Sequence, residues 1–121
     1  MTNPFRDQEK FMRACDQSTG TFNESQYLMY KNLIKEEFTE LLEATGVPEA
    51  ELDALIDILV VTVGAIHSAG FDGEGAWKEV MSTNFSKIDK LTGKVRKRED
   101  GKVLKPMGWT APNLKPYLTK E

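Results

Sequence analysis

The segment from Ile58 to Ile66 constrains the fold of this chain more than any other, because it is the longest apolar run. It is about half as long as a membrane span, so we expect it to be buried within protein. Together with Ile56, it predicts a helix that is apolar on all sides and needs cover on all sides. In a chain of 121 residues, that need favours a homodimer or homotetramer. The alternative is a central helix that its own three neighbours wrap.

Turn and capping residues divide the first 92 residues into four predicted helices. Asn23 stands three residues before Gln26, which is the spacing of a capping box, and it begins the second helix. Pro48 suits the first turn of the third. The four helices are expected at residues 4–17, 23–44, 48–69 and 72 to about 91. This pattern predicts an all-α fold that resembles a four-helix bundle, in one domain spanning residues 1–121.

From Thr92 onward, glycine and proline recur along the chain, and the apolar residues no longer follow a helical spacing. We expect an irregular basic tail over residues 93–121, with a short hairpin from Val95 to Val103. The tail holds eight basic and three acidic residues, a net charge of +5. Residues 1–92 hold eight basic and sixteen acidic residues, a net charge of −8. Two explanations are open: the tail neutralises the body by packing on it, or the protein binds a ligand that carries both metal and phosphate.

The chain has a single cysteine, Cys15, so an intrachain disulfide is excluded and a reducing compartment fits best. Residues Met1 to Asp7 show neither the basic nor the apolar region of a signal peptide. We therefore expect a cytoplasmic protein without a membrane partner. The net negative charge also argues against nucleic acid as a partner.

Carboxylates interrupt the apolar stripes of the second and third predicted helices. Glu37 takes a heptad position in an otherwise apolar stripe, and Glu40 follows three residues later. Asp53 and Asp57 lie four residues apart and share a helix face. Four converging carboxylates are untenable without cations. Carboxylate oxygens suit hard divalent cations, so we expect Mg²⁺, with Mn²⁺ as a substitute, and the chain has no His-rich or Cys-rich ligand set for zinc.

The fourth predicted helix has its own polar interruption. Asn84 falls in the stripe between Val80 and Ile88, and Lys87 follows three residues later. A buried Asn by itself is more often a structural hydrogen-bonding group than a ligand. The single histidine, His67, falls in the last turn of the third helix, where a cation suits the helix dipole.

Three stretches of the sequence carry a family resemblance. The first is Glu36-Glu37-x-x-Glu40, followed by the acidic pair on the next helix. The second is Asn84-x-x-Lys87, and the third runs from Arg98 to Pro106 and continues with Gly108-Trp109. In this combination they resemble the all-α NTP pyrophosphatases, which include the MazG-like proteins, the dimeric dUTPases and the phosphoribosyl-ATP pyrophosphohydrolases. The resemblance covers most of the chain.

The resemblance implies a MazG-like domain with Mg²⁺-dependent nucleoside triphosphate diphosphohydrolase activity. Such an enzyme cleaves a (d)NTP between the α and β phosphates and releases a (d)NMP and pyrophosphate. The implied metal ligands are Glu37, Glu40, Asp53 and Asp57. The family's usual Glu-x-x-Asp pattern has its glutamate at the position that Ala54 occupies in this chain. Asp53 is expected to take the place of that glutamate. Glu36 or Glu37 is expected to orient the attacking water.

The same resemblance implies cations that hold the substrate phosphates. These are Lys87, Arg96, Arg98, Lys102 and Lys105. Asn84 is expected to bind sugar, phosphate or base. Trp109 either closes over the nucleoside or anchors the tail by packing.

Two other functions stay open. Ala54, in the place of a metal-binding glutamate, favours a nucleotide-binding helical dimer without turnover. A purely structural helical dimer, with its acidic cluster solvated, predicts no thermal response to Mg²⁺ and nucleotide.

Overall fold

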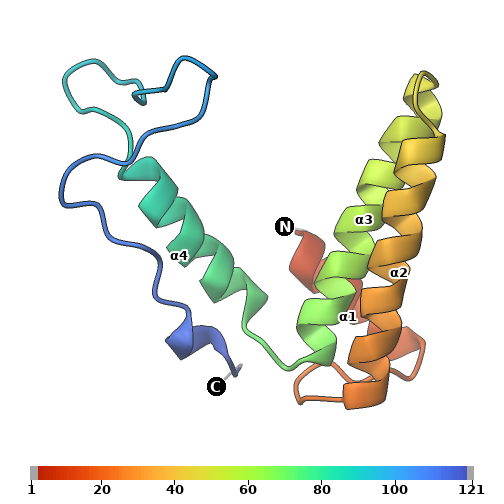
Figure 1. Cartoon of the computed structure of the whole chain (residues 1–121). Coiled ribbons are helices and arrows are strands. Elements are labelled where there is room, and N and C mark those ends of the chain that lie inside the picture. The colour runs from red at the N-terminus through yellow and green to blue at the C-terminus, as the bar shows by residue number, and fades with distance from the viewer. Residues whose placement is uncertain (1–2, 120–121) are drawn as a thin grey trace. The chain divides into compact units, whose positions relative to one another are not determined.

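The computed structural model describes residues 3–119 (Figure 1). These residues form four α-helices and one short 3-10 helix, and no β-strand occurs among them. The elements are α1 (Pro4–Ala14), α2 (Glu24–Glu43), α3 (Pro48–Ser68), α4 (Gly73–Phe85) and the 3-10 helix η1 (Lys115–Tyr117). The predicted all-α fold class is therefore confirmed.

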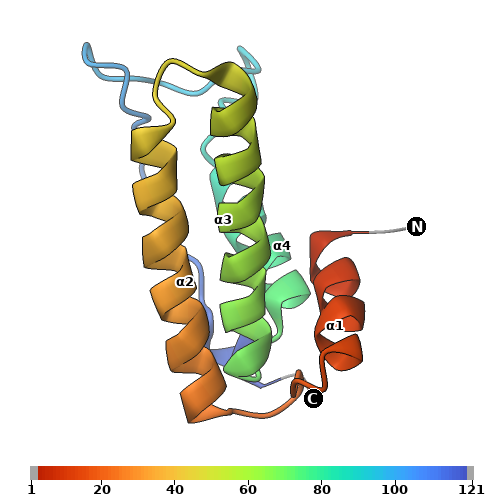
Figure 2. The ribbon, with the colours of Figure 1, turned by 90° about the vertical axis from the view of Figure 1, so that its right-hand side faces the viewer.

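Helices α2 and α3 form an antiparallel pair, joined by a short turn (Figures 1 and 2). Gly46 lies in that turn at φ +90°, a conformation that glycine adopts without a steric penalty. The pair packs closely where Gly64 meets the ring of Tyr30, and a Cβ on Gly64 would collide with that ring. Met12, Tyr30 and Ala65 form the buried core here.

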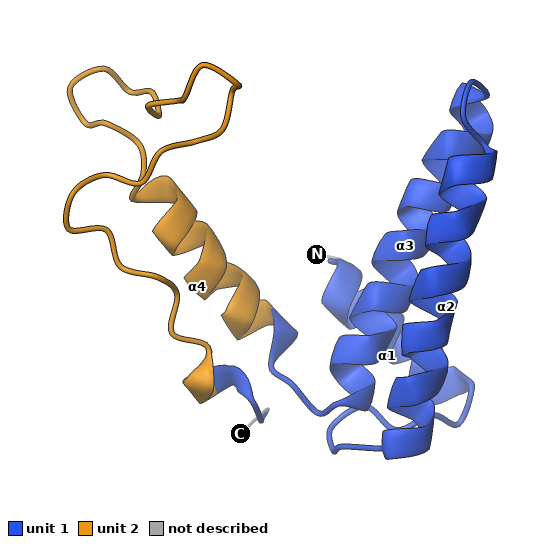
Figure 3. Cartoon of the chain, viewed as in Figure 1, with its two compact units in different colours: residues 1–73, 117–121 blue, residues 74–116 orange. Residues whose placement is uncertain are grey.

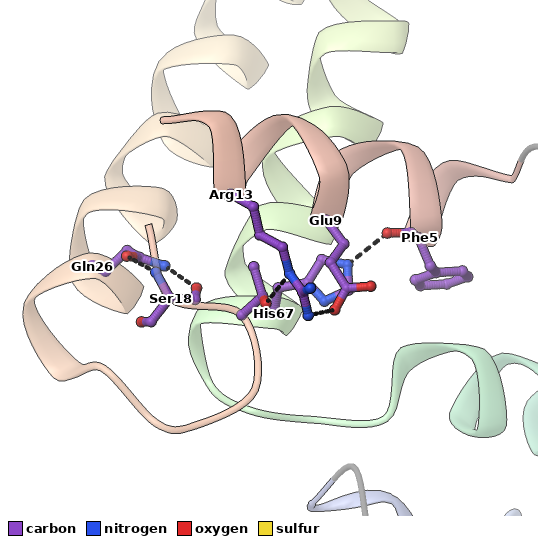
Figure 4. Close-up of polar contacts among 7 residues, drawn as sticks. Phe5, Glu9, Arg13, Ser18, Gln26 and His67 are labelled. Carbon is purple, nitrogen blue, oxygen red and sulfur yellow. Dashed lines mark hydrogen bonds and ion pairs between the residues drawn. The ribbon is translucent and has the colours of Figure 1, made fainter. Parts of the chain in front are cut away.

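Helix α1 packs on α3 through polar contacts as well as through Met12 (Figure 4). His67 is only 2% exposed, and its Nε2 lies 2.7 Å from the carbonyl oxygen of Phe5. A buried polar group that finds a backbone partner is stabilising rather than costly. His67 therefore fastens the start of α1 to the end of α3, a contact that its place in the last helical turn did not indicate.

The predicted N-cap of α2 is confirmed, but the capping box is not reciprocal. The Gln26 N–H donates to Asn23 Oδ1 at 3.1 Å. The Gln26 side chain turns instead to Ser18, accepting from its N–H at 3.1 Å and donating to its carbonyl at 2.8 Å (Figure 4). Gln26 also donates to Ser68 Oγ at 2.8 Å. It thus ties the loop before α2 to the end of α3.

Two helices are shorter than the sequence predicts. α1 ends at Ala14 rather than Gln17, because Asp16 adopts φ +60°, which a right-handed helix does not continue. α4 ends at Phe85 rather than near Leu91. Just beyond it, the Ser86 hydroxyl donates to the Thr83 carbonyl at 2.6 Å. Such side-chain bonds compete with helix continuation.

The described part of the chain divides into two compact units (Figure 3). Unit 1 consists of residues 1–73 and 117–121 and contains α1, α2 and α3. Unit 2 consists of residues 74–116 and contains nearly all of α4 and the loop region that follows it. Among residues 3–119, no single helix is long and apolar enough to cross a membrane, and α3 and α4 reach that length and composition only when taken together across a bend.

The predicted hairpin in unit 2 is present as isolated antiparallel bridges. One bridge pairs Lys97 with Val103, and the Arg98 N–H donates to the Lys102 carbonyl at 2.8 Å. The turn passes through Gly101 at φ +89°. The tail is otherwise irregular, as expected, except for the short helix η1.

Candidate functional site

The carboxylates that the sequence singled out face one another across α2 and α3. They line a pocket of about 550 Å³. Its acidic lining residues are Glu37, Glu40, Glu43, Asp53 and Asp57. All four predicted metal ligands are thus brought to one place. Ala54, which is buried, also lines this pocket at the position where the resemblance leads one to expect a glutamate.

Glu36 and Glu43 complete the acidic surface of α2. Glu36 is exposed and lines an adjoining hollow of about 530 Å³ together with Glu37 and Glu40. Glu43 lines both hollows, although the sequence reasoning left it out of the cluster. The signal that could have found it is its spacing, because Glu43 lies three residues after Glu40 and on the same helix face.

Glu37 is the least satisfied group of the pocket. Its Oε2 atom is buried and has no hydrogen-bond partner among residues 3–119. Hydrogen bonding to Glu40, burial, and the negative charges of Glu40, Asp57 and Asp53 raise the pKa of Glu37 from 4.5 to about 7. A carboxyl in this state lacks a positive partner, so either a proton or a cation must compensate it.

The donor set of the pocket fits a hard divalent cation. All the candidate ligands are carboxylate oxygens, which Mg²⁺ and Mn²⁺ prefer, and Glu37 Oε2 has an unused lone pair. Within residues 3–119, however, no group of three or more acidic, His or Cys side chains is arranged to hold a metal as it stands. A bound cation would relieve the repulsion among these negative charges.

A second cluster lies in unit 2, around the indole ring of Trp109. The indole N–H donates to the Thr83 carbonyl at 2.8 Å. The Lys87 ammonium lies 5.0 Å from the ring centroid and the Lys105 ammonium lies 4.9 Å from it. Lys87 also donates to Asn84 Oδ1 at 3.1 Å. Four predicted substrate-binding residues are therefore neighbours here, although Lys87 lies just beyond α4 rather than on it.

The other predicted phosphate contacts belong to the hairpin. Arg98 forms an ion pair with Asp100 at 2.6 Å, and this contact lowers the pKa of Asp100. The Leu104 N–H donates to the Arg96 carbonyl at 2.7 Å, and the Lys102 N–H donates to Asp100 Oδ1 at 3.1 Å. The structure thus gives Arg98 a role in shaping the turn. Among residues 3–119, it shows no contact that joins the Arg96, Arg98 or Lys102 side chain to Trp109.

An all-helical chain whose α2 and α3 present opposing carboxylates around a polar pocket has the features of an all-α NTP pyrophosphatase. Residues 6–84 match the phosphoribosyl-ATP pyrophosphohydrolase family. The chain belongs to this family, which is part of the all-α, MazG-like superfamily of NTP pyrophosphatases. It is therefore a pyrophosphohydrolase of nucleotides by family. No curated protein is similar enough to the chain to count as a match.

The family match ends at residue 84. The acidic pocket lies entirely inside the matched segment, whereas Lys87, Lys105 and Trp109 lie beyond it. The pocket therefore lies in the segment that matches the family, whereas the Trp109 cluster joins Thr83 and Asn84, at the end of that segment, to residues beyond it.

Proposed function

We propose that this protein is a Mg²⁺-dependent nucleoside triphosphate diphosphohydrolase that acts on cytoplasmic nucleotide pools. It cleaves a (d)NTP between the α and β phosphates and releases a (d)NMP and pyrophosphate. The observation that carries this proposal is the buried, partnerless Oε2 of Glu37 among the carboxylates of α2 and α3. In a family of nucleotide pyrophosphohydrolases, such an acidic pocket needs cations, and a triphosphate substrate needs the same cations.

The positions of the acidic residues support the following roles. Glu37, Glu40, Asp53 and Asp57 hold the cation. When bound, Mg²⁺ neutralises phosphate oxygens and lowers the pKa of a water molecule. Glu36, which is exposed beside Glu37, or Glu37 itself orients the water for attack in line with the leaving pyrophosphate. Phosphoryl-type transfer depends mainly on such positioning and on neutralising charge.

The test is a chromatographic product assay with Mg²⁺ or Mn²⁺ over all common NTPs and dNTPs, with phosphoribosyl-ATP included because of the family name. We expect a nucleoside monophosphate and pyrophosphate as the products. Orthophosphate should appear only after an inorganic pyrophosphatase is added. Direct release of orthophosphate with a nucleoside diphosphate would contradict cleavage between the α and β phosphates.

A second candidate function is nucleotide binding without turnover. Ala54 supports it, because this buried position lines the acidic pocket without supplying a ligand. The discriminating measurement is isothermal titration calorimetry beside the product assay. Mg²⁺-dependent nucleotide binding with no product would favour this second function.

We also propose that the protein works as a homodimer or homotetramer. On α3, a stripe of large apolar side chains is exposed, since neither α1 nor α2 covers it: Leu52, Leu55, Ile56 and Leu59. Phe38 and Leu42 on α2 are exposed as well. Monomeric proteins rarely leave so large an apolar face in water, so a second copy is the proposed cover.

A further inference from the structure

Asp53 lies on the boundary between the acidic pocket and an apolar hollow on α3. It lines the acidic pocket together with the other carboxylates of α2 and α3. It also lines a hollow of about 590 Å³ whose lining residues are Val47, Glu49, Ala50, Leu52, Asp53 and Ile56. Asp53 is exposed, and it is the charged residue that the two linings share. Whatever covers the apolar hollow therefore also borders the proposed cation site.

The apolar hollow continues into the stripe on α3 that we propose as the interface between copies. Leu52 and Ile56 line the hollow and belong to that stripe, together with Leu55 and Leu59. These four exposed side chains follow the spacing i, i+3, i+4, i+7, with which two helices pack along an apolar seam. In a twofold dimer, the same patch of a second copy is the partner of such a seam. The α3 helix of a second copy is therefore the occupant that this face favours.

The position of Asp53 gives such a pairing an electrostatic cost. A carboxylate loses hydration when an apolar interface closes beside it, and it needs a partner to compensate. Among residues 3–119, the Asp53 side chain has no ion pair and no hydrogen bond. A twofold interface brings two of these carboxylates, one from each copy. A divalent cation in the acidic pocket would neutralise Asp53 and lower this cost.

We propose that cation binding in the acidic pocket and the pairing of two copies through α3 strengthen each other, with Asp53 as the residue that couples them. This inference rests on the proposed function for its two events, the binding of Mg²⁺ and the formation of a homodimer. Without the cation, the charge of Asp53 opposes the pairing of the apolar seams. With the cation bound, that opposition is removed. Because coupling is reciprocal, pairing in turn raises the affinity of the pocket for the cation.

The test is sedimentation equilibrium of the full chain over a range of protein concentrations, in EDTA and in Mg²⁺ at equal ionic strength. We expect Mg²⁺ to lower the dimer Kd about tenfold, a common size for a coupling between two sites. Asp53→Asn should pair in EDTA as tightly as the wild type does in Mg²⁺, and Mg²⁺ should not change its Kd. Because Asp53 is exposed, this substitution leaves the packing of α2 on α3 intact.

Glu49→Gln is the matched control, because Glu49 lines the apolar hollow but not the acidic pocket. Its removal should change pairing equally in EDTA and in Mg²⁺, so the response to Mg²⁺ should stay about tenfold. The reciprocal measurement is a Mn²⁺ titration followed by electron paramagnetic resonance, at protein concentrations below and above the dimer Kd. The affinity for Mn²⁺ should rise about threefold on pairing, because the dimer shares its coupling between two cations. Leu59→Glu, which should be monomeric, should show no such rise.

Three results would overturn the inference: an equal wild-type dimer Kd in EDTA and in Mg²⁺, a full response to Mg²⁺ in Asp53→Asn, or the loss of that response in Glu49→Gln. A monomeric wild type would overturn it together with the proposed homodimer. Failure of the inference is distinguishable from failure of the proposed activity. If nucleotide is hydrolysed but pairing ignores Mg²⁺, only the coupling is wrong. If pairing responds to Mg²⁺ through Asp53 but no nucleotide is hydrolysed, only the activity is wrong.

Discussion

Glu37 combines a buried, partnerless oxygen with a pKa that its neighbours raise to about 7. Because this value is above the ordinary 4.5, the folded state favours the protonated acid. The residue therefore adds its full share of stability below about pH 4.5, and this share is lost as the pH rises through 7. In the metal-free protein, the acidic pocket thus opposes folding at neutral and alkaline pH.

Glu37→Gln should make the metal-free protein more stable than the wild type at about pH 8. We expect a gain of around 1 kcal/mol, a modest figure because the pocket is open to solvent. Near pH 4 the difference should vanish, since the wild-type side chain is then neutral as well. Urea unfolding in EDTA over this pH range measures the effect. A constant difference at all pH values would contradict the repulsion.

The same substitution should lower nucleotide hydrolysis by orders of magnitude, because a cation ligand or water-orienting group is lost. The rise in melting temperature on adding Mg²⁺ should shrink with it. Glu51→Gln is the control, as Glu51 lies on α3 outside the lining of the acidic pocket, whereas Glu43 is unsuitable because it lines that pocket. If Glu37→Gln and Glu51→Gln behave alike in both assays, the cation site is elsewhere.

Among the elements, most of the tail is held by a few contacts within unit 2, and its end is held in unit 1 by the bond from the Asp72 N–H to the Tyr117 carbonyl at 2.9 Å. The Trp109 N–H bonds to the Thr83 carbonyl, and the Asn113 N–H bonds to Glu79 Oε2 at 2.8 Å. Helices α1, α2 and α3 depend on contacts made inside unit 1, such as the core around Tyr30. The two parts therefore draw their stability from different contacts.

Deleting residues 93–121 should leave α1, α2 and α3 folded while α4 loses its partners in the tail. Nucleotide affinity should fall, because the deletion removes Lys105 and Trp109, and the response to Mg²⁺ should largely persist. Circular dichroism, Mg²⁺-dependent melting and nucleotide titration measure these three effects. Normal turnover by the truncated protein would show that the tail cations have no part in holding phosphate.

The sequence predicted the start of a helix correctly where a capping or first-turn residue marks it. Asn23 and Pro48 correctly marked the starts of α2 and α3. The end of α4 could not be predicted in the same way, because bonds from the following residues to the hairpin region add to the local contact of Ser86 with Thr83. One of these runs from the Asp89 N–H to the Lys94 carbonyl at 2.8 Å. Such bonds depend on where the following segment of the chain lies, and helical periodicity does not predict them.

Sequence periodicity also predicted the acidic pocket. The heptad position of Glu37 places it opposite Asp53 and Asp57 once α2 and α3 pair. The arrangement around Trp109 had no comparable signal. It combines a residue near the end of a helix with two residues of an irregular segment, and no period relates them. The sequence therefore left the role of Trp109 open between stacking and anchoring.

At the scale of the whole molecule, the exposed apolar stripe of α3 predicts self-association. Light scattering at micromolar concentration should give at least twice the chain mass of 13.7 kDa. Leu59→Glu should shift the protein toward the monomer, because a charge would be buried in the proposed interface. Leu91→Glu is the control, since Leu91 is 97% exposed outside this stripe. A monomeric wild type would contradict self-association. It would favour the alternative in which the chain's own helices cover the apolar stripe of α3.

The raised pKa of Glu37 has a consequence for how the protein exchanges protons with its surroundings. Hydrogen bonding to Glu40 and the neighbouring negative charges favour a proton on this carboxyl in the metal-free protein. A divalent cation has to expel that proton before it can use the oxygen. Uptake of the proposed cation should therefore release acid, its apparent affinity should rise with pH, and the heat it produces should depend on the buffer that accepts the proton.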